Sequence, residues 1–127
     1  MTRLLSWALV ATAIIVLAAC TSGTSGRAAE SSIDPDALTI SANNLVFSTN
    51  TLSAPADEPF QIVFDNQESP PHNVAIYRDS SAAEKVFGEE PISGPAVVTY
   101  DVPPLPAGTY FFRCDVHPEM AGELIAR

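Results

Sequence analysis

The strongest constraint on the fold is an alternation of apolar and polar residues in short runs between residues 38 and 127. A period of two is typical of β-strands that bury one face and expose the other. Proline, glycine and asparagine residues separate the runs, and no long helical period intervenes. The runs lie at 38–40, 45–47, 60–64, 74–76, 98–100, 110–112 and around residue 124. This pattern excludes a coiled coil and predicts an all-β domain of seven to eight short strands, arranged as an antiparallel sandwich or barrel.

One segment departs from the strand pattern. Residues 79–87 contain the run Ser-Ser-Ala-Ala-Glu-Lys, which has no alternation of apolar and polar residues. Asp79 or Ser80 would serve as the N-cap of a helix that begins there. We therefore expect a short helix or a loop inserted over one edge of the β domain.

The charge balance limits the partners of the chain. The 127 residues include six Lys and Arg against fifteen Asp and Glu, for a formal net charge of -9. Binding to a phosphate backbone requires a basic surface, so nucleic acid is not an expected partner. The length suits one compact domain with flanking tails.

The N-terminal residues 1–19 have the layout of an export signal. Arg3 gives a positive start, residues 4–19 are almost wholly apolar, and small residues precede Cys20. The apolar run is shorter than the roughly 20 residues of a spanning helix, although an uncleaved anchor and a soluble secreted protein stay open as alternatives. The sequence Leu-Ala-Ala-Cys resembles a bacterial lipobox, which implies cleavage before Cys20 and lipidation of its thiol. We expect an exported, lipid-anchored protein on a cell membrane, facing the periplasm or the cell exterior.

Residues 20–37 differ in composition from the β domain. After Cys20 they are mainly small and polar, with no aromatic residue, and such a segment cannot bury enough apolar area to order itself. The expected organisation is thus a signal peptide over 1–19, a lipidated cysteine and flexible tether over 20–37, and a single β domain over 38–127.

A cluster of soft ligand types follows the strand predicted at 110–112. Cys114, His117 and Met120 occur at positions i, i+3 and i+6. Thiolate and thioether ligands favour copper, whereas structural zinc sites use four Cys or His ligands, and calcium and magnesium prefer oxygen. The chain has only one other histidine, His72, at the start of the strand predicted at 74–76. A sandwich could bring it beside the last loop.

Each of these residues also has a simpler interpretation. A lone cysteine at the end of a strand is ordinarily a small buried hydrophobe, a nearby methionine fills the core, and a His-Pro pair forms a turn. The order His72, Cys114, His117, Met120, however, uses both histidines and the only cysteine left free if Cys20 is lipidated. The joint pattern therefore indicates a metal site.

These residues resemble the ligand segments of the cupredoxin family, and within it the small blue copper proteins of the plastocyanin, pseudoazurin and amicyanin type. Pro-His72-Asn73-Val is similar to their first-ligand segment, and Cys114-x-x-His117-x-x-Met120 is similar to the short ligand loop of amicyanin. The resemblance implies a Greek-key sandwich that holds one type 1 copper ion. It also implies that His72, Cys114 and His117 form a trigonal plane of ligands and that Met120 is the weak axial ligand.

The resemblance extends to residues beside the ligands. In the family, the asparagine after the first histidine ties the two ligand loops together, commonly through a Ser or Thr after the cysteine. Here Asn73 is present, but the second position is Asp115. A carboxylate so close to the site is expected to favour Cu(II) and lower the reduction potential. Pro118 lacks a backbone N–H, which would limit movement of the loop and the donors around the site.

The resemblance also implies a function, that of an electron carrier which passes single electrons between redox proteins. The outer ring edge of His117 would face the partner within an apolar patch of small area, made of Pro70, Pro71, Pro118 and Ala121. Glu68, Glu119 and the acidic net charge would steer a basic partner, such as a c-type cytochrome or an oxidase domain. We expect a monomer.

Two other functions stay open at this point. The chain could carry or store copper outside the cytoplasm without redox turnover, or it could be a binding or structural module of the same fold. Catalysis by this chain alone is not expected, because copper oxidases and nitrite reductases need further copper sites rich in histidine, and the chain has two histidines.

Overall fold

The computed structural model describes residues 32–127. The predicted signal peptide over 1–19, the lipidation site Cys20 and most of the predicted tether lie outside the described residues. Within residues 32–127, no helix is long and apolar enough to cross a bilayer.

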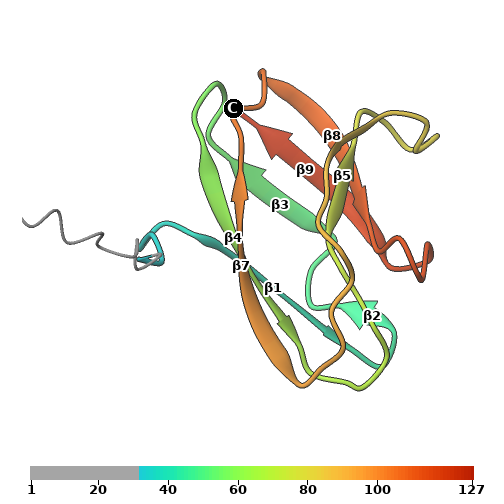
Figure 1. The fold of residues 1–127 in the computed structure, drawn as a ribbon. Coiled ribbons are helices and arrows are strands. Elements are labelled where there is room, and N and C mark those ends of the chain that lie inside the picture. Colours follow the sequence, from blue (N-terminus) through green and yellow to red (C-terminus); the bar gives the residue numbers. More distant parts are fainter. Residues whose placement is uncertain (1–31) are drawn as a thin grey trace, which may run out of the picture. The chain divides into compact units, whose positions relative to one another are not determined.

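Residues 38–127 form a sandwich of two β-sheets (Figure 1). The strands are β1 (Leu38–Asn43), β2 (Val46–Phe47), β3 (Thr51–Ala54), β4 (Phe60–Asn66), β5 (Ala75–Tyr77), β6 (Lys85–Phe87), β7 (Ala96–Val102), β8 (Gly108–Arg113) and β9 (Ala121–Ala126). One sheet has the order β2-β1-β4-β7, and the other has the order β3-β9-β8-β5-β6. The predicted all-β sandwich is confirmed, although residues 32–127 form nine strands where seven to eight were expected.

The strand pairing is more mixed than the antiparallel arrangement that we expected. β1 pairs in parallel with β4, and β3 pairs in parallel with β9, whereas the other strand pairs are antiparallel. The alternation of apolar and polar residues fixes which face of a strand is buried, but it is the same for either strand direction. The sequence pattern therefore predicts the strands without predicting the direction of their neighbours.

Residues 79–87 form a turn and then a strand. The Asp79 side chain accepts a hydrogen bond from the Ser81 N–H at 2.9 Å, and its carbonyl accepts one from the Ala82 N–H at 3.1 Å. Asp79 thus caps a turn rather than a helix. The chain then enters β6, which pairs with β5 and places Lys85 opposite Tyr77. Of the helix and the loop that were expected here, the structure has the loop, which ends in an additional strand.

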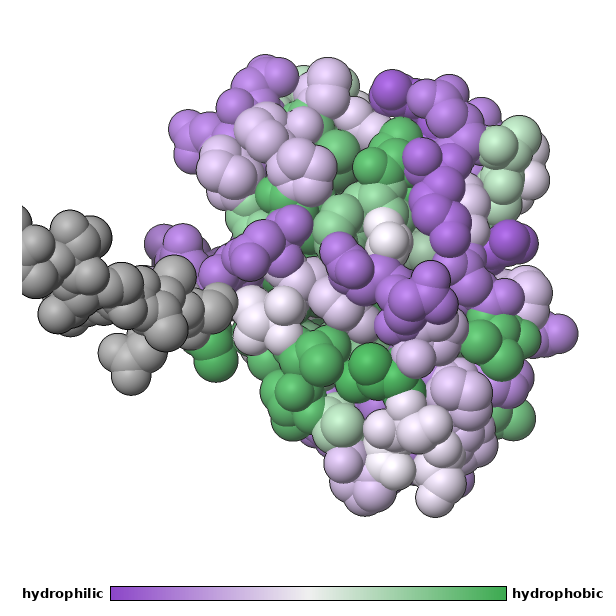
Figure 2. Space-filling view, in the orientation of Figure 1, coloured by the Kyte–Doolittle hydropathy of each residue, from purple (hydrophilic) through white to green (hydrophobic). Residues whose placement is uncertain are grey.

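The core lies between the two sheets and is built from the inward side chains of both. Its fully buried members include Ile62 and Phe64 from β4, Ile76 from β5, Phe112 from β8 and Leu124 from β9. On the outside, apolar residues form small groups separated by polar ones in the view of Figure 2. A rigid, closely packed interior of this kind holds the ends of its strands in fixed positions.

The aromatic residues divide between the core and the outer surface. Phe47 packs against Phe64 and Phe112, with ring centroids 6.4 and 5.7 Å away. Phe111 is only half-buried because it alternates with its core neighbour Phe112 along β8. Tyr77 is buried but does not belong to the core cluster.

Candidate metal centre

The candidate ligands lie at one end of the sandwich, where β5 begins and β8 ends. Because β5 pairs antiparallel with β8, residues just before Ala75 lie beside residues just after Arg113. This pairing brings together His72 and Cys114, which are 42 residues apart in sequence. The loop from β8 to β9 then supplies His117 and Met120.

Backbone hydrogen bonds close this loop tightly. The Cys114 N–H donates to the Met120 carbonyl at 2.9 Å, and the Met120 N–H donates to the His117 carbonyl at 3.0 Å. Cys114 is fully buried, and Met120 is 2% exposed. All three residues are therefore positioned by the backbone of a single short loop.

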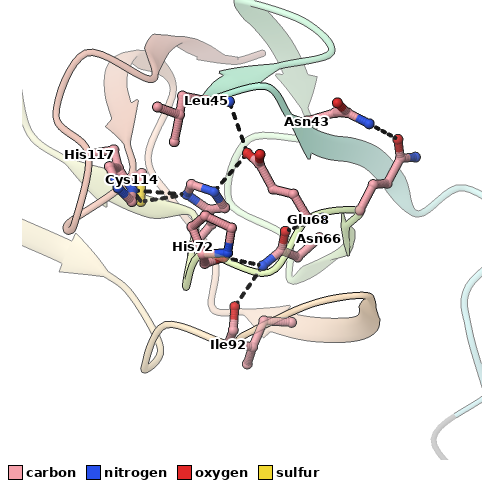
Figure 3. Close-up of polar contacts among 10 residues, drawn as sticks. Asn43, Leu45, Asn66, Glu68, His72, Ile92, Cys114 and His117 are labelled. Carbon is pink, nitrogen blue, oxygen red and sulfur yellow. Dashed lines mark hydrogen bonds and ion pairs between the residues drawn. The ribbon is translucent and has the colours of Figure 1, made fainter.

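Three donor atoms converge on one point (Figure 3). The Nδ1 atoms of His72 and His117 are 3.1 Å apart, and the Cys114 Sγ lies 3.6 Å from the first and 4.0 Å from the second. Metal bonds of about 2.0 Å to nitrogen and about 2.3 Å to sulfur, arranged trigonally, would separate such atoms by about 3.5–3.7 Å. The triangle therefore has the size that one ion requires. Two imidazoles and a thiolate, with a buried thioether at the end of the loop, are consistent with one type 1 copper ion.

Glu68 orients the ring of the buried His72. Its Oε1 atom lies 3.0 Å from the His72 Nε2 and accepts a hydrogen bond of 2.9 Å from the Leu45 N–H (Figure 3). The pKa of the Glu68 carboxyl is lowered mainly by the hydrogen bond from the Leu45 N–H and further by the hydrogen bond with His72. Since an ionised carboxylate only accepts hydrogen bonds, we assign the proton to Nε2, which leaves the Nδ1 lone pair facing the site. The sequence predicted Glu68 only as a surface charge.

Asn73 ties the two ligand segments together, as the family resemblance implied. It is fully buried. Its Oδ1 accepts a hydrogen bond from the Asp115 N–H at 2.8 Å, and its Nδ2 donates to the Asp115 Oδ2 at 3.0 Å and to the Glu89 carbonyl at 2.8 Å. Asp115 thus takes the part that the resemblance gives to a serine or threonine.

Asp115 has two further partners that sequence reasoning missed. The Lys85 Nζ lies 2.6 Å from its Oδ2, and the Tyr77 hydroxyl donates to its Oδ1. Burial raises the pKa of the Asp115 carboxyl, but hydrogen bonds from Lys85, Tyr77 and Asn73 together outweigh it and hold the pKa below 3.8. The hydrogen bond to Asp115 raises the pKa of Lys85. Only the spatial neighbourhood of β5 and β6 could have revealed this pair.

The surroundings of the site contain the residues of the expected apolar patch. Pro70, Pro71 and Pro118 are exposed, and Ala121 is half-buried. His117 is half-buried, whereas His72 is wholly buried. Glu119 is exposed beside Pro118.

Two further exposed apolar side chains lie near the candidate ligands. One is next to His117 in sequence, and the other belongs to a residue that is hydrogen-bonded to Glu68. Val116 is 44% exposed next to His117, and Leu45, whose N–H bonds to Glu68, is 48% exposed. Leu45 and its neighbour Asn44 both adopt positive φ angles, at 60° and 54°. This conformation is rare for a leucine and projects its side chain from the turn between β1 and β2.

Comparison with known families and structures identifies relatives. The family model described as a cupredoxin-like domain matches residues 10–126. Among solved structures, the reduced auracyanin of Roseiflexus castenholzii has a TM-score of 0.64 and 16% identity, covering 72% of this chain and 96% of that chain. Auracyanin A of Chloroflexus aurantiacus, described as a blue copper protein, has a TM-score of 0.63 and 18% identity, with coverage of 72% and 98%.

A third similar structure has a higher sequence identity. Amicyanin of Paracoccus versutus has a TM-score of 0.57 and 25% identity, covering 75% of this chain and 85% of that chain. No curated protein sequence matches the chain.

Proposed function

The chain belongs to the cupredoxin-like family, and from this premise we propose that it is a membrane-tethered type 1 copper protein that transfers single electrons between redox partners outside the cytoplasm. The convergence of the His72 Nδ1, the His117 Nδ1 and the Cys114 Sγ carries this proposal. A similar structure, auracyanin A, is described as a blue copper protein.

In this proposal His72, Cys114, His117 and Met120 would hold the copper ion, because two imidazoles, a thiolate and a thioether are the donor set of a type 1 site. Copper, when bound, supplies a one-electron couple between Cu(II) and Cu(I). The chain fixes the ligands before metal arrives: Glu68 orients His72, and the Cys114 N–H is bonded across the loop. Ligands held in this way move little between the two oxidation states, which favours rapid electron transfer.

The two histidines differ in exposure, and this difference indicates which side of the site would meet a redox partner. His72 is 0% exposed, whereas His117 is half-buried and adjoins the exposed Val116 and Pro118. We assign to His117 the role of facing the redox partner. The net charge of -9, with Glu119 exposed beside the loop, suits a basic partner such as a c-type cytochrome or an oxidase domain.

The tethered location rests on the N-terminal sequence. Cleavage after residue 19 and lipidation of Cys20 would anchor the chain, and the polar segment that follows would let the domain move near the membrane surface. In this proposal the anchored domain faces the periplasm or the cell exterior.

The two cysteines allow one experiment with a matched control. We would titrate the detergent-solubilised full chain with Cu(II), recording visible absorption and the EPR spectrum, for the wild type, Cys114→Ser and Cys20→Ser. The wild type and Cys20→Ser should bind one equivalent with an intense thiolate-to-copper band and a narrow hyperfine splitting, and Cys114→Ser should lose both. A pale tetragonal spectrum in the wild type would refute the electron carrier, and rapidly exchanging Cu(I) would favour copper carriage instead.

The same variants test the anchor. The wild type should fractionate with membranes and carry a lipid mass on Cys20 of the cleaved chain, whereas Cys20→Ser should lack the lipid mass. Recovery of both proteins in the soluble fraction would refute the tether while leaving the copper site intact.

A further inference from the structure

Asp115 places a carboxylate directly after the proposed ligand Cys114. A negative charge beside a copper site stabilises Cu(II) over Cu(I) and lowers the reduction potential. The structure shows that this carboxylate is not alone, because the ammonium group of Lys85 lies 2.6 Å from its Oδ2.

We propose that Lys85 is a positioning residue that neutralises Asp115, so that the Lys85–Asp115 pair, and not the carboxylate alone, sets the reduction potential of the centre. This inference rests on the proposed copper function. Lys85 lies on β6, a strand that contributes none of the proposed ligands.

Two contacts hold the Lys85 ammonium group in place. Its Nζ bonds to Asp115 and lies 5.7 Å from the centroid of the Tyr77 ring. The Tyr77 hydroxyl donates to the other carboxylate oxygen, Oδ1. Arg113 covers the same ring, at 4.9 Å from its centroid. The cation–π contact with the Tyr77 ring thus helps to hold the ammonium group beside the carboxylate.

The environment of the pair limits screening by solvent. The side chains of Lys85 and Asp115 are 46% and 23% exposed, so the carboxylate is largely withdrawn from water. A partly buried pair interacts through a lower effective dielectric constant than an exposed one. The paired lysine therefore offsets much of the field that Asp115 exerts on the neighbouring ligand loop.

The fold explains why Lys85 reaches this position. The turn at residues 79–82 directs the chain back along β5, and β6 then pairs with β5 so that Lys85 lies opposite Tyr77. Asp115 approaches from the end of β8, on the other side of β5. The two charges meet across the short strand β5, which separates β6 from β8.

The test compares reduction potentials of the copper-loaded full chain in five variants. Lys85→Met removes the cation but keeps an apolar stem over Tyr77, and Asp115→Asn removes the carboxylate but keeps its shape. The double variant removes both charges, and Lys85→Arg is the conservative rescue. Arg127→Met is the matched control, because it removes one positive charge at the far end of β9 from the ligand loop.

We expect Lys85→Met to lower the equilibrium constant for reduction about tenfold, which is a fall of about 59 mV for one electron. Asp115→Asn should raise it by a similar factor, and the double variant and Lys85→Arg should stay near the wild type. The blue absorption band and EPR splitting should persist in every variant. Raising the ionic strength should reduce the effect of Lys85→Met.

Three results would overturn the inference, and they are distinguishable. If the wild type forms no blue site, the proposed function fails and the inference with it. If the wild type is blue but Lys85→Met shifts the potential no more than Arg127→Met, only the inference fails. Loss of the blue spectrum in Lys85→Met would show that Lys85 merely maintains the structure of the loop.

Discussion

Asn73 makes the connection between the two ligand segments, so its replacement offers a sharp test of how the site is held. Asn73→Ala removes three hydrogen bonds, of 2.8, 3.0 and 2.8 Å, from a side chain that is fully buried. At about 1 kcal/mol for each bond, the free energy of unfolding should fall by about 3 kcal/mol. For a domain of this size the Tm should fall by about 15 °C.

The assay is urea unfolding of the metal-free protein, combined with amide hydrogen exchange. In Asn73→Ala the amide of Asp115 loses its acceptor and should exchange faster than in the wild type. A loss of less than about 1 kcal/mol, or an Asp115 amide that keeps its protection, would refute the reasoning.

Asn66 provides the matched control. It is also fully buried and makes three hydrogen bonds, donating to the carbonyls of Pro70 and Ile92 and accepting from the Glu68 N–H. Asn66→Ala should cost a similar free energy of unfolding. The Asp115 amide, however, should stay protected in the native state, because the Asn66 side chain bonds to Pro70, Ile92 and Glu68 and not to Asp115.

Three further predictions concern packing, backbone strain and pH. In Gly122→Ala the new Cβ would lie 2.4 Å from the Asn50 carbonyl oxygen and 2.5 Å from the Phe112 ring, so the free energy of unfolding in urea should fall by about 2–3 kcal/mol. In the control Gly88→Ala the new Cβ would have no neighbour nearer than 3.1 Å, and an equal loss in the two variants would contradict this prediction. Leu45→Gly removes the strain of a leucine at φ 60° and should leave the metal-free protein as stable or up to about 1 kcal/mol more stable; clear destabilisation would show that the leucine side chain is needed for packing. Because the pKa of Asp115 is lowered in the folded protein, its ionised form stabilises the fold above pH 3.8, and this contribution is lost as the pH falls through the folded-state pKa. The difference in free energy of unfolding between the wild type and Asp115→Asn should therefore shrink in strong acid. A difference that does not change with pH would contradict the assignment.

The ligand set could be predicted from the sequence because its signal is local and chemical. Cys114, His117 and Met120 recur at a fixed spacing of three, and the scarcity of histidine leaves His72 as the remaining imidazole. The structure brings His72, Cys114 and His117 together within 4.8 Å. The tie through Asn73 was also expected, although its carboxylate partner left the details of the bond open.

The residues that support the ligands could not be predicted in the same way. Glu68 bonds to His72 across a loop, where a spacing of four residues has no fixed geometry. Lys85 lies 30 residues before Asp115 in a segment for which the sequence indicated a helix or a loop. These contacts depend on which strands become neighbours, and the alternation of residues within one strand carries no information on that choice.

By itself, the sequence determined that the chain forms an all-β domain and which side chains offer soft ligands, because strand alternation and ligand chemistry are properties of single segments. The tertiary structure decided the parallel pairing of β1 with β4, the strand β6, and the meeting of Lys85 with Asp115. Such contacts arise only when both sheets close on one core and bring distant segments within a few ångströms. The candidate ligands were thus encoded locally, whereas the charges and hydrogen bonds around them were set by the fold.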